Sequence, residues 1–297
     1  MPDAAILASP KRTYRGEITD PARWSIYTAR VGDVMVCTPA KCGTTWTQTI
    51  LVRLLAGGDL PGPVPEVSPW IDSNMRDADE KKRALAAQTG RRVVKTHTPG
   101  DGFPVWEGVP VVAVYRHPLD VFLSIRKHIH NMAGRGDHPL KAPMGEALEF
   151  YLTNPFQDGD VDRDSLDTLV SHYRRTVDTL RGRDLTVLHY ADMMADRAGA
   201  VARLAQAAGI TPEAEVMAAV TEATGFEAMK ARANEYAPGG GTGLWQSDTD
   251  FFAKGGTGNW AGVLSDAQVA RYQARMAELV PEPALRLWLE QGGPHPG

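Results

Sequence analysis

The chain has 297 residues, 43% of them hydrophobic and 23% charged, a composition that is ordinary for a globular protein and excludes intrinsic disorder and fibrous repeats. Its formal net charge of −4 provides no general attraction to nucleic acid or to anionic lipid, so any anion site must be built locally. The longest apolar run, 109–115, is far shorter than the roughly 20 residues that a membrane-spanning helix needs, so no transmembrane segment is expected.

The amino terminus carries an early acidic residue, Asp3, and only a short apolar patch, so it lacks the pattern of a secretion signal. The two cysteines, Cys37 and Cys42, have the spacing of neither a C-x-x-C redox pair nor a zinc site. We therefore expect a cytoplasmic protein with two reduced thiols.

Short β-branched runs alternate with longer helical patterns along the chain. Strands are predicted at 33–37, 92–96, 109–115 and 185–190. Helices are predicted at 44–56, 118–132, 165–180, 197–208 and 265–279. This alternation indicates one α/β, P-loop-like domain over 1–297, with a central parallel sheet flanked by helices on both faces.

Two segments, 131–164 and 236–260, fit no regular element. Loops of this length are usually functional or disordered, and the aromatic residues within them favour docking onto the protein. We expect both segments to be long loops that cover the active site.

The first segment whose residue types suggest a binding site is TPAKCGTTW at 38–46. It follows the predicted strand at 33–37 and leads directly into a predicted helix. Free N–H groups at a helix start carry partial positive charge, and Gly43 lets the backbone approach a ligand closely. Lys41, Thr44 and Thr45 add a cation and hydroxyl donors, which suits a phosphate or a sulfate. The order differs from the G-x-x-x-x-G-K-[ST] pattern of nucleotide triphosphatases, and an ordinary strand–helix turn capped by Thr44 is the alternative interpretation.

The second segment, RVVKTHTP at 92–99, is a strand that ends in polar residues. Strand alternation places Lys95 and His97 on one face. Near an anion site this pair offers a cation for developing negative charge and a base that titrates near neutrality. A histidine that merely caps a strand end is the alternative.

The third segment is VYRHPLDVFLS at 114–124. In it Arg116 directly follows the longest apolar strand, and a helix is predicted to start at Pro118. The planar guanidinium suits a phosphate, and Ser124 on the adjoining helix can complete the contact. A surface ion pair between Arg116 and Asp120 is the alternative.

Together these segments resemble the cytosolic sulfotransferase family, whose donor is 3′-phosphoadenosine 5′-phosphosulfate (PAPS). The resemblance implies that His97 is the catalytic base, that Lys41 contacts the leaving oxygen and that Lys95 assists the transferring group. It also implies nucleotide-binding roles for the residues of the first and third segments, namely Lys41, Cys42, Gly43, Thr44, Thr45, Trp46, Arg116 and Ser124.

Three later segments extend the resemblance: HYADM at 189–193, TGFEAM at 224–229 and FAKGGTGNW at 252–260. They imply further nucleotide contacts from Tyr190, Thr224, Phe226, Lys254 and Gly255. The sequence departs from the family pattern where an arginine, a serine and a lysine are usual, at Ala253, Cys42 and Ala261. The short dimer segment of many members is also missing, which leaves the oligomeric state open.

The resemblance implies transfer of a sulfuryl group from PAPS to a hydroxyl or amine of a small acceptor, leaving adenosine 3′,5′-bisphosphate (PAP). A P-loop kinase-like phosphotransferase and a non-catalytic nucleotide-binding protein are the alternatives. No metal is expected, because His128 and His130, two apart on a helix, point in different directions.

The acceptor is expected to be apolar or amphipathic, because the less matched segments are rich in aromatic residues and methionine. The alternative is that these side chains fill small cores under the loops. The residues in question are Trp70, Phe103, Trp106, Met132, Met144, Phe150, Tyr151, Phe156, Tyr236 and Trp245.

Overall fold

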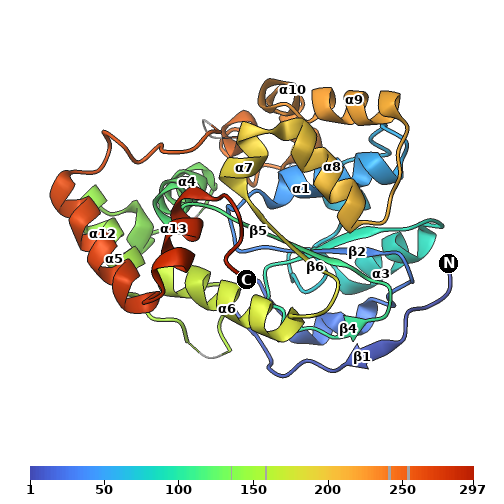
Figure 1. Cartoon of the computed structure of the whole chain (residues 1–297), viewed down its shortest axis with the longest axis horizontal. Coiled ribbons are helices and arrows are strands. Elements are labelled where there is room, and N and C mark those ends of the chain that lie inside the picture. Colours follow the sequence, from blue (N-terminus) through green and yellow to red (C-terminus); the bar gives the residue numbers. More distant parts are fainter. Residues whose placement is uncertain (135, 158, 240–241, 253–254) are drawn as a thin grey trace.

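A four-stranded parallel sheet forms the centre of the protein (Figure 1). Its strands lie in the order β3-β2-β5-β6. The computed structural model describes residues 1–134, 136–157, 159–239, 242–252 and 255–297. The parallel strands are β2 (Val34–Cys37), β3 (Val93–Thr96), β5 (Val111–Tyr115) and β6 (Leu185–His189). A separate antiparallel pair consists of β1 (Ile6–Ala8) and β4 (Val105–Trp106).

Helices cover both faces of the parallel sheet, which confirms the predicted fold class (Figure 1). Alternation along β5 explains the two layers: Val112 and Val114 face one cluster of buried side chains, whereas Ala113 and Tyr115 face the other. The first layer consists of α1 (Thr44–Leu55), α7 (Tyr190–Ala195), α8 (Arg197–Ala207) and α9 (Ala214–Ala223). The second consists of α4 (Pro118–Asn131), α5 (Met144–Thr153), α6 (Leu166–Leu180), α12 (Asp266–Leu279) and α13 (Pro283–Gln291).

Further helices lie in the connections between these layers and the strands. The α-helices among them are α2 (Val64–Val67), α3 (Ala78–Ala87), α10 (Phe226–Lys230) and α11 (Ala233–Tyr236). The 3-10 helices are η1 (Pro21–Ile26), η2 (Pro139–Lys141) and η3 (Thr249–Phe251). In the part of the chain that the structure describes, no helix has both the length and the apolar character needed to cross a bilayer.

The predicted strands and helices are confirmed, with bounds that differ by one or two residues. The prediction that 131–164 is a long loop is wrong in part, because this segment contains η2 and α5. Helix α5 buries Ala147, Leu148, Tyr151 and Leu152 against the other helices of the second layer. Its apolar residues have helical spacing, but Gly145 in the first turn and the prolines before it mask the signal.

The parallel strands all end at one edge of the sheet, so the polar segments that follow them meet there. One further segment extends the sheet sideways: residues 69–71 run parallel to the outer strand β3. The backbone N–H of Lys95 donates to the Pro69 carbonyl at 3.0 Å, and the N–H of Ile71 donates to the Lys95 carbonyl at 3.0 Å. These bonds satisfy backbone groups that an open sheet edge would leave unpaired.

A buried ion pair joins the opposite, amino ends of β2 and β3. The side chains of Arg92 and Asp33 are 2% and 0% exposed. The carboxylate of Asp33 also accepts hydrogen bonds from the Tyr27 hydroxyl at 2.9 Å and from the backbone N–H of Arg92 at 3.0 Å. Both charges are therefore satisfied only while both partners are present.

We predict that Asp33→Asn lowers the free energy of unfolding by about 3 kcal/mol, because it leaves the Arg92 guanidinium buried without a counter-charge. Urea denaturation of the variant and the parent protein measures this difference. A loss well below about 1 kcal/mol would mean that water reaches Arg92 and that the pair is energetically equivalent to an exposed one.

Candidate active site

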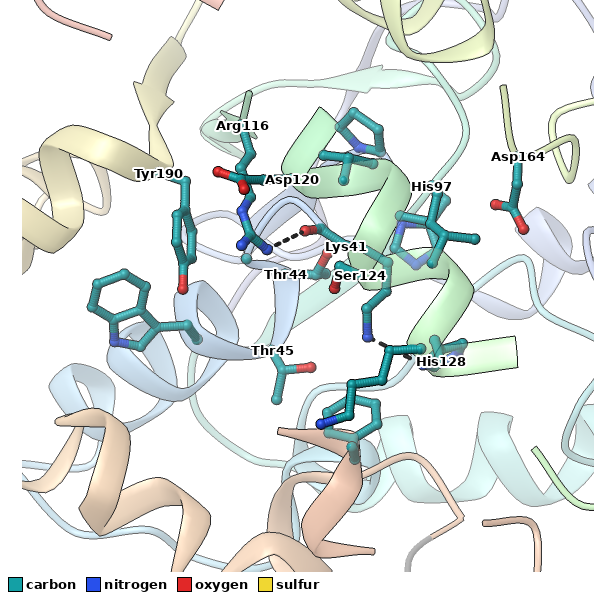
Figure 2. Close-up of a pocket in the computed structure, with 18 of the residues that line it drawn as sticks. Lys41, Thr44, Thr45, His97, Arg116, Asp120, Ser124, His128, Asp164 and Tyr190 are labelled. Carbon is teal, nitrogen blue, oxygen red and sulfur yellow. Dashed lines mark hydrogen bonds between the residues drawn. The ribbon is translucent and has the colours of Figure 1, made fainter. Parts of the chain in front are cut away.

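A cavity of about 540 Å³ opens at the carboxyl edge of the sheet, within the size range of small-molecule sites. Figure 2 shows Tyr190 and Arg116 toward one end, His97 and Asp164 toward the other, and Lys41 between them. The strands and helices on which these residues lie are far apart in sequence, so the cavity exists only in the assembled sheet.

The loop before α1 forms an anion cradle. Lys41 adopts a left-handed backbone conformation with φ 64°, and Gly43 follows with φ 101°. A Cβ atom on Gly43 would lie 3.0 Å from the ring of Tyr190, so both the torsion and the close approach require glycine here. Helix α1 starts at Thr44 without a side-chain cap, which leaves N–H groups of its first turn available to an anion.

The side chain of Lys41 is partly buried at the centre of the cavity. Its Nζ lies 3.1 Å from Nδ1 of His128 and 4.7 Å from the ring centroid of Phe251. Desolvation, followed by the charge of Arg116, lowers the pKa of Lys41 to about 8. A bound anion would therefore stabilise the charged form of this lysine.

Arg116 lies over the ring of Tyr190, with 4.5 Å between the guanidinium carbon and the ring centroid. It donates hydrogen bonds to the carbonyls of Gly256 at 3.0 Å and of Lys41 at 3.4 Å. Its Nε is buried and has no hydrogen-bond partner among the described residues. A buried donor without a partner carries a free-energy penalty.

The glycine-rich segment 255–259 lies against the start of α4. Asp120, the alternative partner considered for Arg116, accepts hydrogen bonds from the backbone N–H groups of Gly258 at 2.8 Å and Asn259 at 2.7 Å. Gly255 has φ 64°, and a Cβ atom there would lie 2.8 Å from the ring of Phe226. The segment is thus held close to the cavity wall, while the predicted Lys254 and the adjacent Ala253 lie outside the described residues.

Aromatic side chains line the end of the cavity near Tyr190. The rings of Trp46 and Tyr190 lie 5.5 Å apart at an angle of 69°. Thr224 also lines this end, and its hydroxyl donates to the carbonyl of Val220 at 2.7 Å. The walls near Trp46 can therefore enclose a flat aromatic group such as a nucleobase.

His97 is oriented by a backbone carbonyl. Its Nδ1 lies 2.6 Å from the carbonyl oxygen of Thr38, which can only accept, so Nδ1 carries the hydrogen and Nε2 holds the lone pair of the neutral ring. Nζ of Lys95 lies 3.4 Å from Nε2. The ring of Trp70 contacts both side chains, at 4.4 Å from Nζ of Lys95 and 4.6 Å from the His97 ring centroid.

The environment keeps His97 neutral. Desolvation, then the charge of Lys95, holds the pKa of His97 well below its usual range, against the hydrogen bond to Thr38. Desolvation also lowers the pKa of Lys95 to about 7. An imidazole with an unprotonated Nε2 next to a lysine is suited to accept a proton while negative charge develops nearby.

The structure brings nearly all described residues of the predicted site to this one cavity. Cys42 is the exception, because its side chain is fully buried among core residues of the second helix layer. The predicted residues that line the cavity are Lys41, Gly43, Thr44, Thr45, Trp46, Lys95, His97, Arg116, Ser124, Tyr190, Thr224, Phe226 and Gly255.

Three of the expected acceptor-side residues line the cavity: Trp70, Met132 and Trp245. For the others the core-filling alternative holds, because they pack into buried clusters or against a neighbouring ring: Phe103, Trp106, Met144, Phe150, Tyr151, Phe156 and Tyr236. Sequence reasoning missed the lining residues Arg163, Asp164, Arg197 and Met229.

His128, considered above as a metal ligand, lies one helical turn after Ser124, and that spacing indicates a shared face of α4. The structure places His128 at Lys41, whereas His130 is exposed. Among the described residues, no three His, Cys, Asp or Glu side chains gather closely enough to hold a metal ion.

Comparison with known proteins adds a family to this geometry. Residues 32–282 match the family described as sulfotransferase domain. A glycolipid sulfotransferase of Mycobacterium bovis is 34% identical over 308 residues, a match that covers 94% of each chain. Rat sulfotransferase 1A1 is 24% identical, over 85% of this chain and 86% of that protein.

The crystal structure of mouse sulfotransferase SULT7A1 complexed with PAP superposes with a TM-score of 0.66. The match covers 88% of both chains at 18% identity. At this identity the likeness establishes a shared fold, and it agrees with the parallel sheet and two helix layers described above.

Proposed function

The chain belongs to the sulfotransferase domain family, and on this basis we propose that it transfers a sulfuryl group from PAPS to a hydroxyl or amine of an amphipathic acceptor. The observation that carries the proposal is the single cavity that holds both an anion cradle and the unprotonated Nε2 of His97. Family membership favours this function over the kinase-like and the non-catalytic alternatives.

The residues present fit the donor. The N–H groups at the start of α1 and Lys41 would hold the 5′-phosphosulfate, and Arg116, whose Nε lacks a partner among the described residues, would hold the 3′-phosphate together with Ser124. Trp46 and Phe226 would enclose the adenine. When bound, PAPS supplies the sulfuryl group.

In the proposed mechanism His97 removes the proton of the acceptor through Nε2 as the acceptor attacks. The carbonyl of Thr38 keeps Nδ1–H in place, so the ring cannot turn its free nitrogen away, and this carbonyl stabilises the imidazolium that forms. Lys41, Lys95 and the N–H groups of the cradle stabilise negative charge that develops on the leaving oxygen and the transferring group.

The proposed acceptor combines an apolar part with a polar head. The Mycobacterium bovis relative is named a glycolipid sulfotransferase. Apolar residues such as Trp70, Met75 and Leu169 line this cavity, and so do the acidic residues Glu17 and Asp164. Carboxylates accept hydrogen bonds from sugar hydroxyls, while the apolar surface suits a hydrocarbon chain.

We also propose that 131–164 and 236–260 cover the cavity together, within a single domain. The backbone N–H of Ala133 donates to the Leu244 carbonyl at 2.9 Å, and the N–H of Gln246 donates to the Asn131 carbonyl at 2.8 Å. Met132 and Trp245, which form a β-bridge between these bonds, both line the cavity.

A cytoplasmic location is likewise proposed, supported by two free, buried cysteines.

Transfer assays with radiolabelled PAPS and alkyl glycosides of increasing chain length test the proposed reaction and acceptor. We expect kcat/KM to rise about fourfold for each methylene that becomes buried, which corresponds to about 0.8 kcal/mol. The free sugar with the same head is the matched control and should be a poor acceptor. Equal rates across the series would contradict an apolar acceptor site, and no transfer to any alcohol, phenol or amine would contradict the reaction.

We predict that His97→Ala lowers kcat about 100-fold or more, the usual effect of losing a general base, while the Kd for PAP stays nearly constant. His130→Ala is the matched control, because His130 is exposed on the same helix as His128 and its loss should leave kcat unchanged. Near-normal turnover by His97→Ala would assign the base to another residue.

Binding of PAP is predicted to take up protons near pH 8. In the free protein the pKa values of Lys41 and Lys95 are lowered to about 8 and about 7, so both lysines are largely or partly neutral at this pH. An anionic ligand raises both pKa values, so the affinity for PAP is highest below the free-state pKa values and falls as the pH rises through them.

Titration calorimetry in two buffers of different ionisation enthalpy measures this uptake directly. Lys95→Met should reduce the number of protons taken up without abolishing binding. Proton release, or an affinity that increases between about pH 7 and pH 9, would contradict the proposed placement of the anion beside these lysines.

A further inference from the structure

Asp72 is a fully buried carboxylate that the proposed mechanism does not use. It accepts a hydrogen bond from the hydroxyl of Thr98 at 2.6 Å and from the hydroxyl of Thr96 at 2.8 Å. These two threonines are the immediate neighbours of His97 in the chain. One side chain from a different segment is therefore bonded to the residues on both sides of His97.

The backbone at His97 is held further by bonds within the same turn. The N–H of Thr98 donates to the hydroxyl of Thr96 at 2.9 Å, so this hydroxyl both accepts from the turn and donates to Asp72. The carbonyl of Thr38 fixes the other end of the residue, at Nδ1 of the ring. The position of Nε2 depends on both sets of bonds, because the ring can move only if the backbone or the Nδ1 contact changes.

The segment that carries Asp72 is itself anchored. Nζ of Lys81, on α3, donates to the carbonyls of Trp70, Ile71 and Ser73 at distances of 2.5 to 3.1 Å. Lys81 is 4% exposed, so these three carbonyls satisfy a cation that has little contact with water. The parallel pairing of 69–71 with β3 holds the same segment from its other side.

The charge of Asp72 has consequences for its neighbours. Burial raises the pKa of the carboxyl, and the hydrogen bonds from Thr98 and Thr96 oppose this increase. The carboxylate in turn raises the pKa of the buried Lys95, which lies next to His97. Asp72 therefore holds the side chains of Thr96 and Thr98 through hydrogen bonds. It also favours the charged form of Lys95.

We propose that Asp72 is a positioning residue for the reaction: through Thr96 and Thr98 it holds His97 where Nε2 can reach the proton of the acceptor. The proposal rests on the proposed role of His97 as the base. A reacting group that is displaced by about 1 Å loses on the order of 100-fold in rate, so a tie of this kind affects kcat rather than binding of the nucleotide.

The first test is Asp72→Asn, which keeps the size of the side chain and removes its charge. We expect kcat to fall about tenfold or more while the Kd for PAP, measured by calorimetry, changes by less than about twofold. Asp33→Asn is the matched control: Asp33 is a buried carboxylate bonded to Arg92 at the amino end of β3, opposite the end where Asp72 is bonded, and the change should lower the melting temperature without lowering kcat. Unchanged kcat in Asp72→Asn would overturn the proposal.

A double-mutant cycle with His97→Ala separates positioning from a general structural effect. If Asp72 acts through His97, adding Asp72→Asn to His97→Ala should change the residual rate by less than about twofold. A further loss of about tenfold in that background would overturn the proposal. Normal turnover by His97→Ala alone would instead contradict the proposed role of His97 as the base, so the two failures are distinguishable.

A milder pair of variants keeps the proposal testable if Asp72→Asn does not fold. Thr98→Val removes one hydroxyl bonded to Asp72 and keeps the shape of the side chain, and we expect kcat to fall about fivefold. Thr98→Ser restores the hydroxyl and should recover most of the activity. Equal kcat in these two variants would overturn the proposal, because the hydrogen bond to Asp72 would then have no effect on the rate.

Discussion

The desolvated positive charge at the carboxyl edge of the sheet is the constraint on which the rest of the site depends. Three of the cations that line the cavity each lie over an aromatic ring: Lys41 over Phe251, Lys95 over Trp70 and Arg116 over Tyr190. An aromatic face attracts a cation without neutralising it. The site can therefore keep these cations out of water while their charge stays available to an anion.

This constraint explains how the sheet edge is built. Carboxylates would stabilise the cations more strongly, but they would also repel the phosphates and sulfate of the proposed donor. The carboxylate of Asp120 is occupied by backbone N–H groups of the glycine-rich segment, and that of Asp72 by two threonine hydroxyls. These two carboxylates thus hold loops in place at the cavity end where the cations lie.

The parts of the site that could be predicted are those that follow a strand directly. Lys41, His97 and Arg116 stand beside apolar runs, and their residue types are unusual enough to signal an anion site. Asp72 and His128 could not be assigned in the same way, because their neighbours lie 24 or more positions away in the chain and only packing of β3 and α4 brings them together. Likewise, most of the aromatic residues expected around the acceptor pack into cores, since burial alone does not distinguish a cavity wall from a core.

The two thiols lie at the working edge of the molecule, Cys37 at the end of β2 and Cys42 inside the anion cradle, yet neither side chain is accessible. Burial raises the pKa of Cys42 to about 12, so this thiol is also protonated at physiological pH. A reagent that needs a thiolate can react only after the core beneath the cradle opens. The rate of thiol labelling therefore reports the opening of the active site itself, and the protein carries its own probe of local unfolding without any introduced label.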